Sequence, residues 1–174
     1  MAPSGVDRLG RLRRIPEPVS GGIGYRCPVP DKVSKSDQEW RELLTPERYA
    51  VLRRGATERA GTGQYVHVKA AGQYLCAGCG AALFDSNAKY DSGSGWPSFY
   101  APVDPATIEE HRDFKMIVPR TEVRCARCGG HLGHVFGDGP VPTGQRYCIN
   151  SAALRFAKAT PAGTATEPQT ESEA

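Results

Sequence analysis

The stretch RTEVRCARCGGHLGHVF, residues 120–136, joins two strand-like segments through a tight cysteine turn. Cys125 and Cys128 flank two residues, and the glycine that follows them removes the Cβ that would obstruct the turn. Similar short segments, rich in β-branched and aromatic residues, recur along the chain: QYVHVK (64–69), QYLC (73–76), KMIVPRTEVRC (115–125), HVF (134–136) and RYCINSAALRF (146–156). Because no helical pattern lies between them, we predict a mainly β fold of short antiparallel strands.

A second cysteine turn of the same form, CAGC, places Cys76 and Cys79 on either side of two residues. Four thiolates crowd together only when a cation lies between them, and four protein sulfurs make the closed tetrahedral site that is usual for structural zinc. A thioredoxin-type redox pair is the competing interpretation of a single CxxC, but a matched second pair favours zinc. We predict one structural zinc ion, joining two parts of a larger domain, on Cys76, Cys79, Cys125 and Cys128.

The chain ahead of these strands predicts two short helices. SKSDQEWRELL (34–44) begins with N-cap candidates and places Trp40 and two leucines on one helical face. In the next segment Thr45 is a natural N-cap and Pro46 a natural first helical residue. Gly55 is expected to end this second helix.

The two ends of the chain differ in composition from its centre. Residues 1–33 hold many Pro, Gly and Arg residues without periodicity, which predicts an irregular arm. The small, polar tail buries too little surface to offset its chain entropy, so we expect disorder over residues 158–174. One folded domain is therefore expected over residues 34–157.

The overall composition excludes several classes of protein. The chain has 174 residues and a net charge of only +3, which is too weak for a typical nucleic-acid binder. No apolar run approaches the roughly 18 residues of a membrane span, and no signal-peptide hydrophobic region follows the N-terminal charges. The arginine-rich start leaves an organellar transit peptide open. Because the cysteine pattern fits a reducing compartment, we expect a cytoplasmic protein, and nothing demands more than a monomer.

Two of the six cysteines, Cys27 and Cys148, remain outside the predicted zinc site. Cys148 lies between Arg146 and Asn150, and all three project from one face if the segment is a strand. Arg146 supplies the positive charge that a reactive thiol requires, and Asn150 can donate or accept hydrogen bonds. A lone buried cysteine is more often a packing residue, so these neighbours alone leave both interpretations of Cys148 open.

Other residues that can serve chemistry lie upstream of Cys148. His131 and His134, in HLGHVF, can deliver protons near neutral pH. Trp96 lies in a glycine-rich turn closed by proline, and Phe136 ends the HVF segment. Each also has an ordinary structural interpretation, because tryptophan usually lies in a core and histidine on a sheet is usually just hydrogen-bonded.

Three stretches together resemble the B-type methionine-R-sulfoxide reductases: CAGCGAALFDSNAKYDSGSGWPSFYAP, RTEVRCARCGGHLGHVFGDGP and PTGQRYCINSAALRF. The likeness spans roughly residues 38–157, in the same order and with similar spacing, and GWPSF, HLGHVFxDGP and RYCxN are specific motifs. The resemblance implies a mostly β fold, a structural zinc on the four cysteines of the two turns, and a catalytic domain over residues 34–157.

The resemblance also implies a reaction, the reduction of the R epimer of methionine sulfoxide in proteins. Cys148 would attack the sulfoxide sulfur while a proton reaches the oxygen, releasing methionine and leaving a sulfenic acid on Cys148. His134 is the expected proton donor, and Arg146, paired with Asp138, is expected to set the field at the thiol. The pocket is implied to be apolar on one side and polar on the other: Trp96 and Phe136, then His131, His134 and Asn150.

The chain departs from the family pattern where many members carry a resolving cysteine, as GCGWP. It reads SGSGWP, and the hydroxyl of Ser94 cannot form a disulfide. Some relatives use a cysteine near the N-terminus, so we expect a Cys27–Cys148 disulfide that thioredoxin reduces. Direct reduction by an external thiol stays open. KMIV (115–118) also lacks the histidine of a common SHGM stretch, which puts more weight on the two histidines of HLGHVF.

Two other classes of protein explain part of the pattern. A zinc-ribbon module for nucleic acid accounts for the two cysteine turns, but not for GWPSF, the paired histidines or Cys148. A cysteine hydrolase could use Cys148 with either histidine, yet no oxyanion-hole motif or orienting third residue is evident.

Overall fold

The structure, a computed structural model of the whole chain, describes residues 32–113 and 119–159. Cys27 and nearly all of the predicted arm lie outside the described residues, as do the KMIV segment and most of the predicted tail. The description that follows therefore concerns the predicted central domain.

The two predicted helices are present and end at the predicted caps. In α1 (Asp37–Leu43) the side chain and backbone of Ser36 form a capping box with the first turn. In α2 (Pro46–Arg54) the hydroxyl of Thr45 accepts from the amide of Arg48, and Gly55 ends the helix at a φ of 68°. None of the helices in the described part of the chain has the length and apolar character that crossing a bilayer requires.

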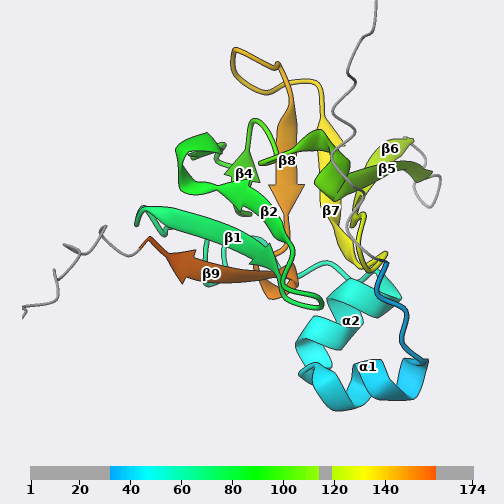
Figure 1. Cartoon of the computed structure of the whole chain (residues 1–174). Helices are drawn as coiled ribbons and strands as arrows, with labels where there is room; N and C mark the ends of the chain where they lie inside the picture. Colours follow the sequence, from blue (N-terminus) through cyan, green and yellow to red (C-terminus); the bar gives the residue numbers. More distant parts are fainter. Residues whose placement is uncertain (1–31, 114–118, 160–174) are drawn as a thin grey trace, which may run out of the picture.

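The described residues form nine strands, and every strand pair is antiparallel, which confirms the mainly β prediction. One sheet has the order β2-β1-β9 and the other the order β3-β4-β8-β7-β6-β5 (Figure 1). The strands are β1 (Gly72–Cys76), β2 (Ala82–Asp85), β3 (Lys89–Tyr90), β4 (Ser98–Phe99), β5 (Ile108–Asp113), β6 (Arg120–Cys125), β7 (His131–Phe136), β8 (Arg146–Ile149) and β9 (Leu154–Lys158). Three short 3-10 helices separate some of them: η1 (Ser86–Ala88), η2 (Pro105–Thr107) and η3 (Ser151–Ala153). β9 includes Lys158, the first residue of the predicted tail.

Aromatic side chains join the two sheets. Phe84 of β2 stacks on Phe99 of β4 with ring centroids 4.4 Å apart. Tyr74 of β1 meets the ring of Phe99 edge-on, with centroids 5.0 Å apart. Tyr147 of β8 approaches Phe84 at 5.8 Å. These contacts cross from the smaller sheet to the larger one, so the buried aromatic area fixes how the sheets lie against each other.

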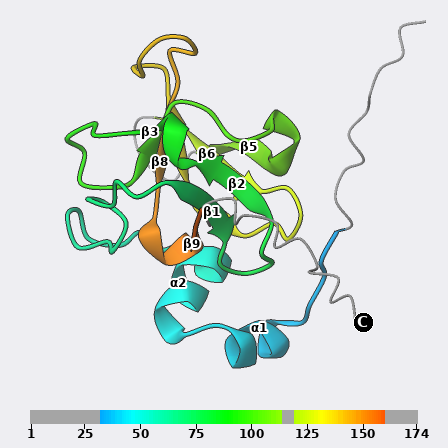
Figure 2. The same ribbon diagram turned by 60° about the vertical axis from the view of Figure 1, so that its left-hand side comes forward.

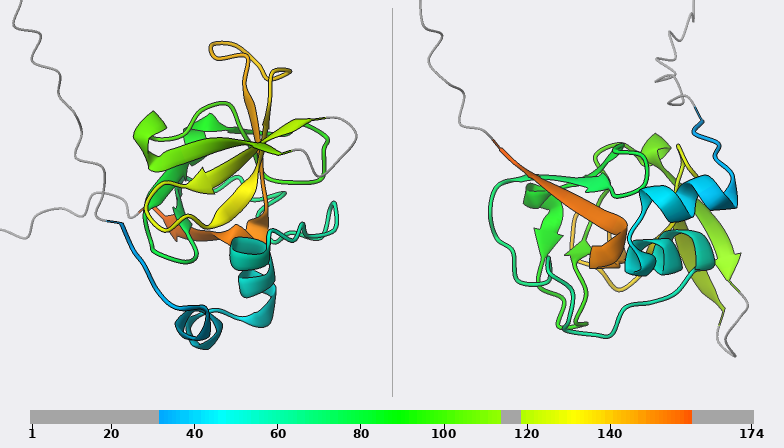
Figure 3. Two further views of the ribbon diagram at one scale, coloured as in Figure 1. Left: turned by 90° about the vertical axis from the view of Figure 1, so that its right-hand side faces the viewer. Right: turned by 90° about the horizontal axis from the view of Figure 1, so that it is seen from below.

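The helices and the β7–β8 loop mark opposite ends of the molecule. Figures 1 and 2 show α1 and α2 together at one end and the loop over residues 137–145 at the other. From below, in the right panel of Figure 3, the helices and β9 lie toward the viewer. α2 packs against both η3 and β7.

The strand predicted over QYVHVK (64–69) is wrong, because this segment forms turns and irregular backbone. The amide of Val66 donates to the carbonyl of Gly63 in a turn, and the amide of Tyr65 donates to the hydroxyl of Ser151. The ring of Tyr65 packs edge-on against Tyr74 at 5.8 Å. Tyr65 thus packs onto the smaller sheet, and the segment does not extend that sheet.

Candidate active site and metal centre

The two cysteine turns have the same backbone form. The amide of Gly80 donates to the carbonyl of Cys76 at 2.9 Å, and the amide of Gly129 donates to that of Cys125 at 2.8 Å. Both glycines have positive φ, 77° and 67°, a conformation that other residues rarely adopt. Each turn follows directly on a strand, β1 or β6, which holds its first cysteine in place.

The four cysteine sulfurs of these turns converge on one point. Their Sγ atoms all lie within 4.8 Å of one another, with Cys76 3.7 Å from Cys128 and Cys79 3.6 Å from Cys125. A tetrahedron of sulfurs about 2.3 Å from a central zinc has edges of about 3.8 Å. The sulfur positions therefore fit a closed four-thiolate metal site, as the sequence predicted.

A pocket of about 120 Å³ opens beside Cys148 on β8. Six of the predicted site residues line it together: Trp96, His134, Phe136, Arg146, Cys148 and Asn150. Ser94, at the position of the family's usual resolving cysteine, lines it as well. His131 does not line it, although its ring lies 5.6 Å from that of His134.

The register of the larger sheet gathers these side chains on one face. Cys148 lies directly opposite His134 of β7 on one side and Ser98 of β4 on the other. Two residues along β8, Arg146 lies opposite Phe136. Directly opposed residues of an antiparallel pair point to the same face, so three strands supply the surroundings of the Cys148 sulfur.

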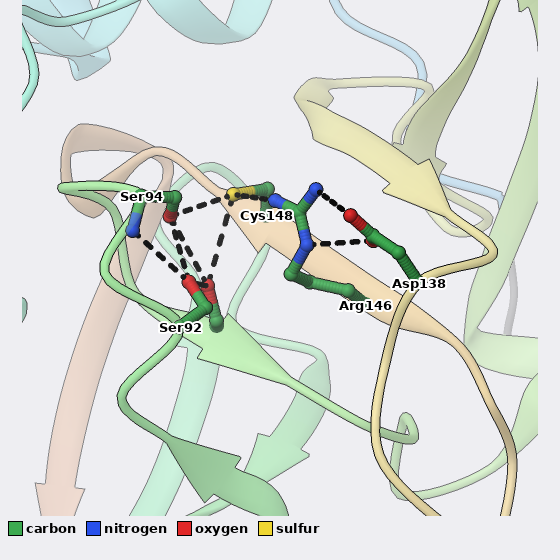
Figure 4. A network of polar contacts seen from close by, with 6 residues as sticks. Ser92, Ser94, Asp138, Arg146 and Cys148 are labelled. Carbon is green, nitrogen blue, oxygen red and sulfur yellow. Dashed lines mark hydrogen bonds and ion pairs between the residues drawn. The ribbon is translucent and has the colours of Figure 1, made fainter.

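The sulfur of Cys148 lies between a guanidinium and a cluster of hydroxyls (Figure 4). Nη1 of Arg146 donates to Sγ at 3.3 Å, while Oγ of Ser94 lies 3.2 Å and Oγ of Ser98 3.7 Å from the same atom. Ser92 joins the two hydroxyls, 2.8 Å from Ser94 and 2.7 Å from Ser98. A positive charge on one side and hydrogen-bond donors on the other stabilise negative charge on the sulfur.

Arg146 is itself fixed by two neighbours. Its Nε and Nη2 donate to the two carboxylate oxygens of Asp138, each at 2.8 Å, and its Cζ lies 4.4 Å from the centre of the Phe136 ring. The hydrogen bond with Asp138 raises the pKa of Arg146, and the same contact lowers the pKa of Asp138. The guanidinium therefore stays charged and keeps one orientation toward Cys148.

His134 is oriented by a carboxylate that the sequence analysis did not single out. Its Nε2 lies 3.0 Å from Oδ2 of Asp113, and Nη2 of Arg120 donates to the same oxygen at 3.3 Å. Asp113 is buried at the end of β5, and Arg120, at the start of β6, also lines the pocket. The Asp113 carboxylate thus fixes the orientation of the His134 ring in the pocket.

His131 faces a different partner. Its Nδ1 lies 2.6 Å from Glu122, and the other oxygen of this carboxylate accepts from Arg124 at 2.7 Å. Burial raises the pKa of Glu122, but the hydrogen bonds from Arg124 and His131 outweigh it and leave that pKa below its ordinary value. His131 thus makes a buried hydrogen-bonded contact between β6 and β7 and is not among the residues that line the pocket.

The segment between α2 and β1 closes the opposite wall of the pocket. The indole Nε1 of Trp96 donates to the carbonyl of Glu58 at 3.1 Å, and the amide of Glu58 donates to Oδ1 of Asn150 at 3.1 Å. Nδ2 of Asn150 donates to the carbonyl of Leu132 at 2.9 Å. Thr57 lines the pocket from the same segment. No local pattern marks Thr57 or Glu58, because the contacts of Glu58 join positions far apart in the chain.

Comparison with known proteins agrees with this geometry. The SelR domain matches residues 44–158. The chain is 60% identical over 126 residues to the "Peptide methionine sulfoxide reductase MsrB" of Hahella chejuensis, covering 72% of this chain and 91% of that protein. The protein of the same name from Bradyrhizobium diazoefficiens is also 60% identical over the same shares of both chains. That from Leptospira interrogans is 55% identical over 127 residues, 73% of this chain and 97% of that protein. By the extent of these matches, the chain belongs to the SelR-domain family of MsrB peptide methionine sulfoxide reductases.

Proposed function

We propose that the pocket beside Cys148 is where this chain reduces the R epimer of methionine sulfoxide in proteins, with Cys148 as the nucleophile. Membership of the MsrB family supplies the reaction, and the pocket supplies the residues. The observation that carries the assignment is the contact of Arg146 with the Cys148 sulfur, inside a pocket that Trp96 and His134 also line.

The first step transfers the sulfoxide oxygen to the enzyme. The thiolate of Cys148 attacks the sulfoxide sulfur, which is electrophilic because its S–O bond is polarised. His134 delivers a proton to the oxygen, and Asp113 supports the protonated ring at 3.0 Å. Methionine leaves, the S–O bond of the substrate is broken, and Cys148 carries the oxygen as a sulfenic acid.

The two sides of the pocket differ in polarity, which accounts for selection of one epimer. Trp96 and Phe136 provide the apolar surface for the substrate methyl group, while His134 and Asn150 provide the polar surface for the oxygen. An R sulfoxide satisfies both surfaces at once. The S epimer places its oxygen against the apolar side, where the oxygen loses its hydrogen bonds.

The second step returns Cys148 to its thiol with electrons from a thiol reductant. Ser94 lies against the sulfur but has no thiol to offer. We propose Cys27, which lies outside the described residues, as the resolving thiol: it attacks the sulfenic sulfur, water leaves, and thioredoxin reduces the resulting disulfide. Direct attack by an external thiol is the alternative outcome of the test below.

We propose zinc as the ion at Cys76, Cys79, Cys125 and Cys128. The sulfur spacing and the all-thiolate ligand set support zinc over harder cations, which prefer oxygen ligands. With four protein ligands the ion has no position left for substrate, so its contribution is to hold the two turns together.

One equivalent of a peptide containing methionine-R-sulfoxide, added without reductant, tests both steps. Mass spectrometry should find a Cys27–Cys148 disulfide in the natural protein and a sulfenic acid on Cys148 in the Cys27→Ser variant. A sulfenic acid in both proteins would assign resolution to an external thiol. Release of methionine with Cys148 unmodified in the Cys27→Ser variant would exclude Cys148 as the nucleophile.

A further inference from the structure

We infer that Glu58 is a positioning residue for this reaction, holding Trp96 and Asn150 in place around Cys148; the inference rests on the function proposed above. Glu58 lies in GATERAGTG (55–63), where the structure has neither helix nor strand. Irregular backbone keeps one conformation only where specific contacts hold it, and Glu58 makes such contacts with both its side chain and its backbone.

The Glu58 carboxylate holds the chain that follows the nucleophile. Oε1 accepts from the amide of Ser151 at 2.6 Å, and Oε2 accepts from the amide of Ala152 at 3.0 Å. Ser151 and Ala152 are only 1% and 7% exposed, so water does not readily replace the carboxylate at these amides. Hydrogen bonds to an ionised acceptor are stronger than neutral ones, and this pair fixes backbone three and four residues beyond Cys148.

The Glu58 backbone holds the two pocket residues themselves. Its carbonyl accepts from the indole Nε1 of Trp96, and its amide donates to Oδ1 of Asn150, each at 3.1 Å. The carboxylate anchors Glu58, and the anchored backbone then fixes the tryptophan and the amide. One residue thus connects the apolar wall, the polar wall and the segment after the nucleophile.

The surroundings allow Glu58 little freedom to move. The amide of Gly61 donates to the carbonyl of Gly95, next to Trp96, at 2.8 Å. At Gly63 an added Cβ would lie 2.5 Å from Oε1 of Glu58 and 2.3 Å from Oγ of Ser151. Because the chain after Glu58 is held this closely at Gly61 and Gly63, a displaced Glu58 carboxylate would displace the segment 55–63 as well.

Loss of the carboxylate should affect substrate binding more than the reactivity of the thiol. Arg146 and Ser94, which contact the sulfur, form no hydrogen bond or ion pair with Glu58 in the described part of the chain. Small displacements of positioning groups can cost large factors in rate, so Glu58→Ala should lower kcat/KM at least about tenfold, chiefly through KM. Cys148 should keep its rate of alkylation by iodoacetamide.

The test compares Glu58→Ala and Glu58→Gln with the natural protein and with Glu47→Ala, a control at an exposed glutamate of α2. Glutamine keeps the shape and one acceptor oxygen, so its KM should lie between those of the natural protein and Glu58→Ala. Fluorescence supplies a second measurement, because the chain has two tryptophans and Trp40 is 2% exposed. Acrylamide should quench the Trp96 emission more strongly in Glu58→Ala, while Glu47→Ala should match the natural protein.

A KM and a quenching constant unchanged within about twofold in Glu58→Ala would contradict the inference. If Glu58→Ala does not fold, Glu58→Gln decides, and unchanged values in that variant would contradict it equally. A fall in kcat alone, with KM and quenching unchanged, also counts against a positioning role. Cys148→Ser, assayed in parallel, reports on the proposed function separately, because retained turnover there overturns Cys148 as nucleophile whatever Glu58 does.

Discussion

The sulfur of Cys148 has two kinds of neighbour: a positively charged guanidinium and the hydroxyl groups of serines. Arg146, held by Asp138, presents a fixed positive charge at 3.3 Å, and Ser94 lies 3.2 Å away on the other side. Both contacts place polar groups against the sulfur, and these groups can also hydrogen-bond a sulfenic acid formed there. Ser94 therefore contributes a polar contact to the Cys148 sulfur, although it has no thiol that could form a disulfide.

Ser94→Cys should give Cys148 a resolving thiol at once. The Ser94 oxygen already lies within contact of Sγ, so a sulfur at that position can attack the sulfenic acid with little movement. After one equivalent of substrate, mass spectrometry of Ser94→Cys in a Cys27→Ser background should show a bridge between residues 94 and 148. If no disulfide forms between residues 94 and 148 and a sulfenic acid persists on Cys148, the geometry described for this turn is contradicted.

Neighbouring strands are joined through charge as well as through their backbone. Glu122 of β6 lies against His131 of β7 and accepts from Arg124, and its side chain is only 9% exposed. The contacts lower the pKa of Glu122 below its ordinary 4.5. Ionised Glu122 therefore stabilises the fold above that pH, and the stabilisation is lost as the pH falls through the lowered value.

Glu122→Gln should reduce the free energy of unfolding by about 2 kcal/mol near pH 6, because a neutral amide replaces the ionised acceptor between Arg124 and His131. The difference between the two proteins should shrink as the pH falls below 4.5 and through the lowered pKa of Glu122, where the natural carboxylate takes up a proton. Urea unfolding at several pH values measures it. A difference that stays constant down to pH 3 would show that Glu122 does not contribute through its charge.

The metal site joins the ends of strands from both sheets. Cys76 ends β1 of the smaller sheet and Cys125 ends β6 of the larger one. The helices cover this junction: an added Cβ at Gly78 would lie 3.6 Å from Trp40 and 3.6 Å from Leu52. Metal, helix pair and strand ends thus form one unit.

Cys125→Ser should lose the metal and lower the thermal midpoint by about 10 °C or more, since metal binding and folding are coupled in such sites. Cys27→Ser is the matched control, because Cys27 belongs to neither cysteine turn. Metal content by atomic absorption and thermal unfolding by circular dichroism give the two measurements. Full metal content in Cys125→Ser would remove this residue from the ligand set.

Local signals predicted some elements well and others poorly. The caps at Ser36 and Thr45 were predictable because a cap needs only its own first turn. β5, with the sequence IEEHRD, was missed because an edge strand carries charge where an inner strand carries apolar residues. Over 64–69 the aromatic pattern indicated a strand, but those side chains pack onto a neighbouring sheet.

The same distinction separates the predictable part of the site from the rest. Arg146 and Asn150 lie two residues from Cys148, so the alternation of a strand was enough to place them beside it. Asp113 lies 21 residues from its partner His134 and Glu58 lies 94 residues from Ala152, so no local pattern in the sequence indicates either contact. His131 was grouped with the pocket because it shares a strand with His134, yet it pairs with Glu122 instead.

At the scale of the whole molecule, the four-cysteine site and the pocket are separate sites, one proposed to stabilise the fold and one to carry out catalysis. β7 connects them, because it begins beside the second cysteine turn and continues past His134 to Phe136. The antiparallel pairing of β7 with β8 places His134 opposite Cys148. We propose that the pocket carries out catalysis and that a metal bound by the four cysteines would stabilise the strand ends beside it.

The central claim is that Cys148 reduces one epimer of methionine sulfoxide. The most direct measurement follows thiol-driven turnover of the separate R and S epimers in a peptide, for the natural protein and for Cys148→Ser with its metal content verified. The account predicts consumption of the R epimer alone and no turnover by the metal-replete Cys148→Ser protein. Reduction of the S epimer at a comparable rate, or retained R-epimer turnover in Cys148→Ser, would contradict it.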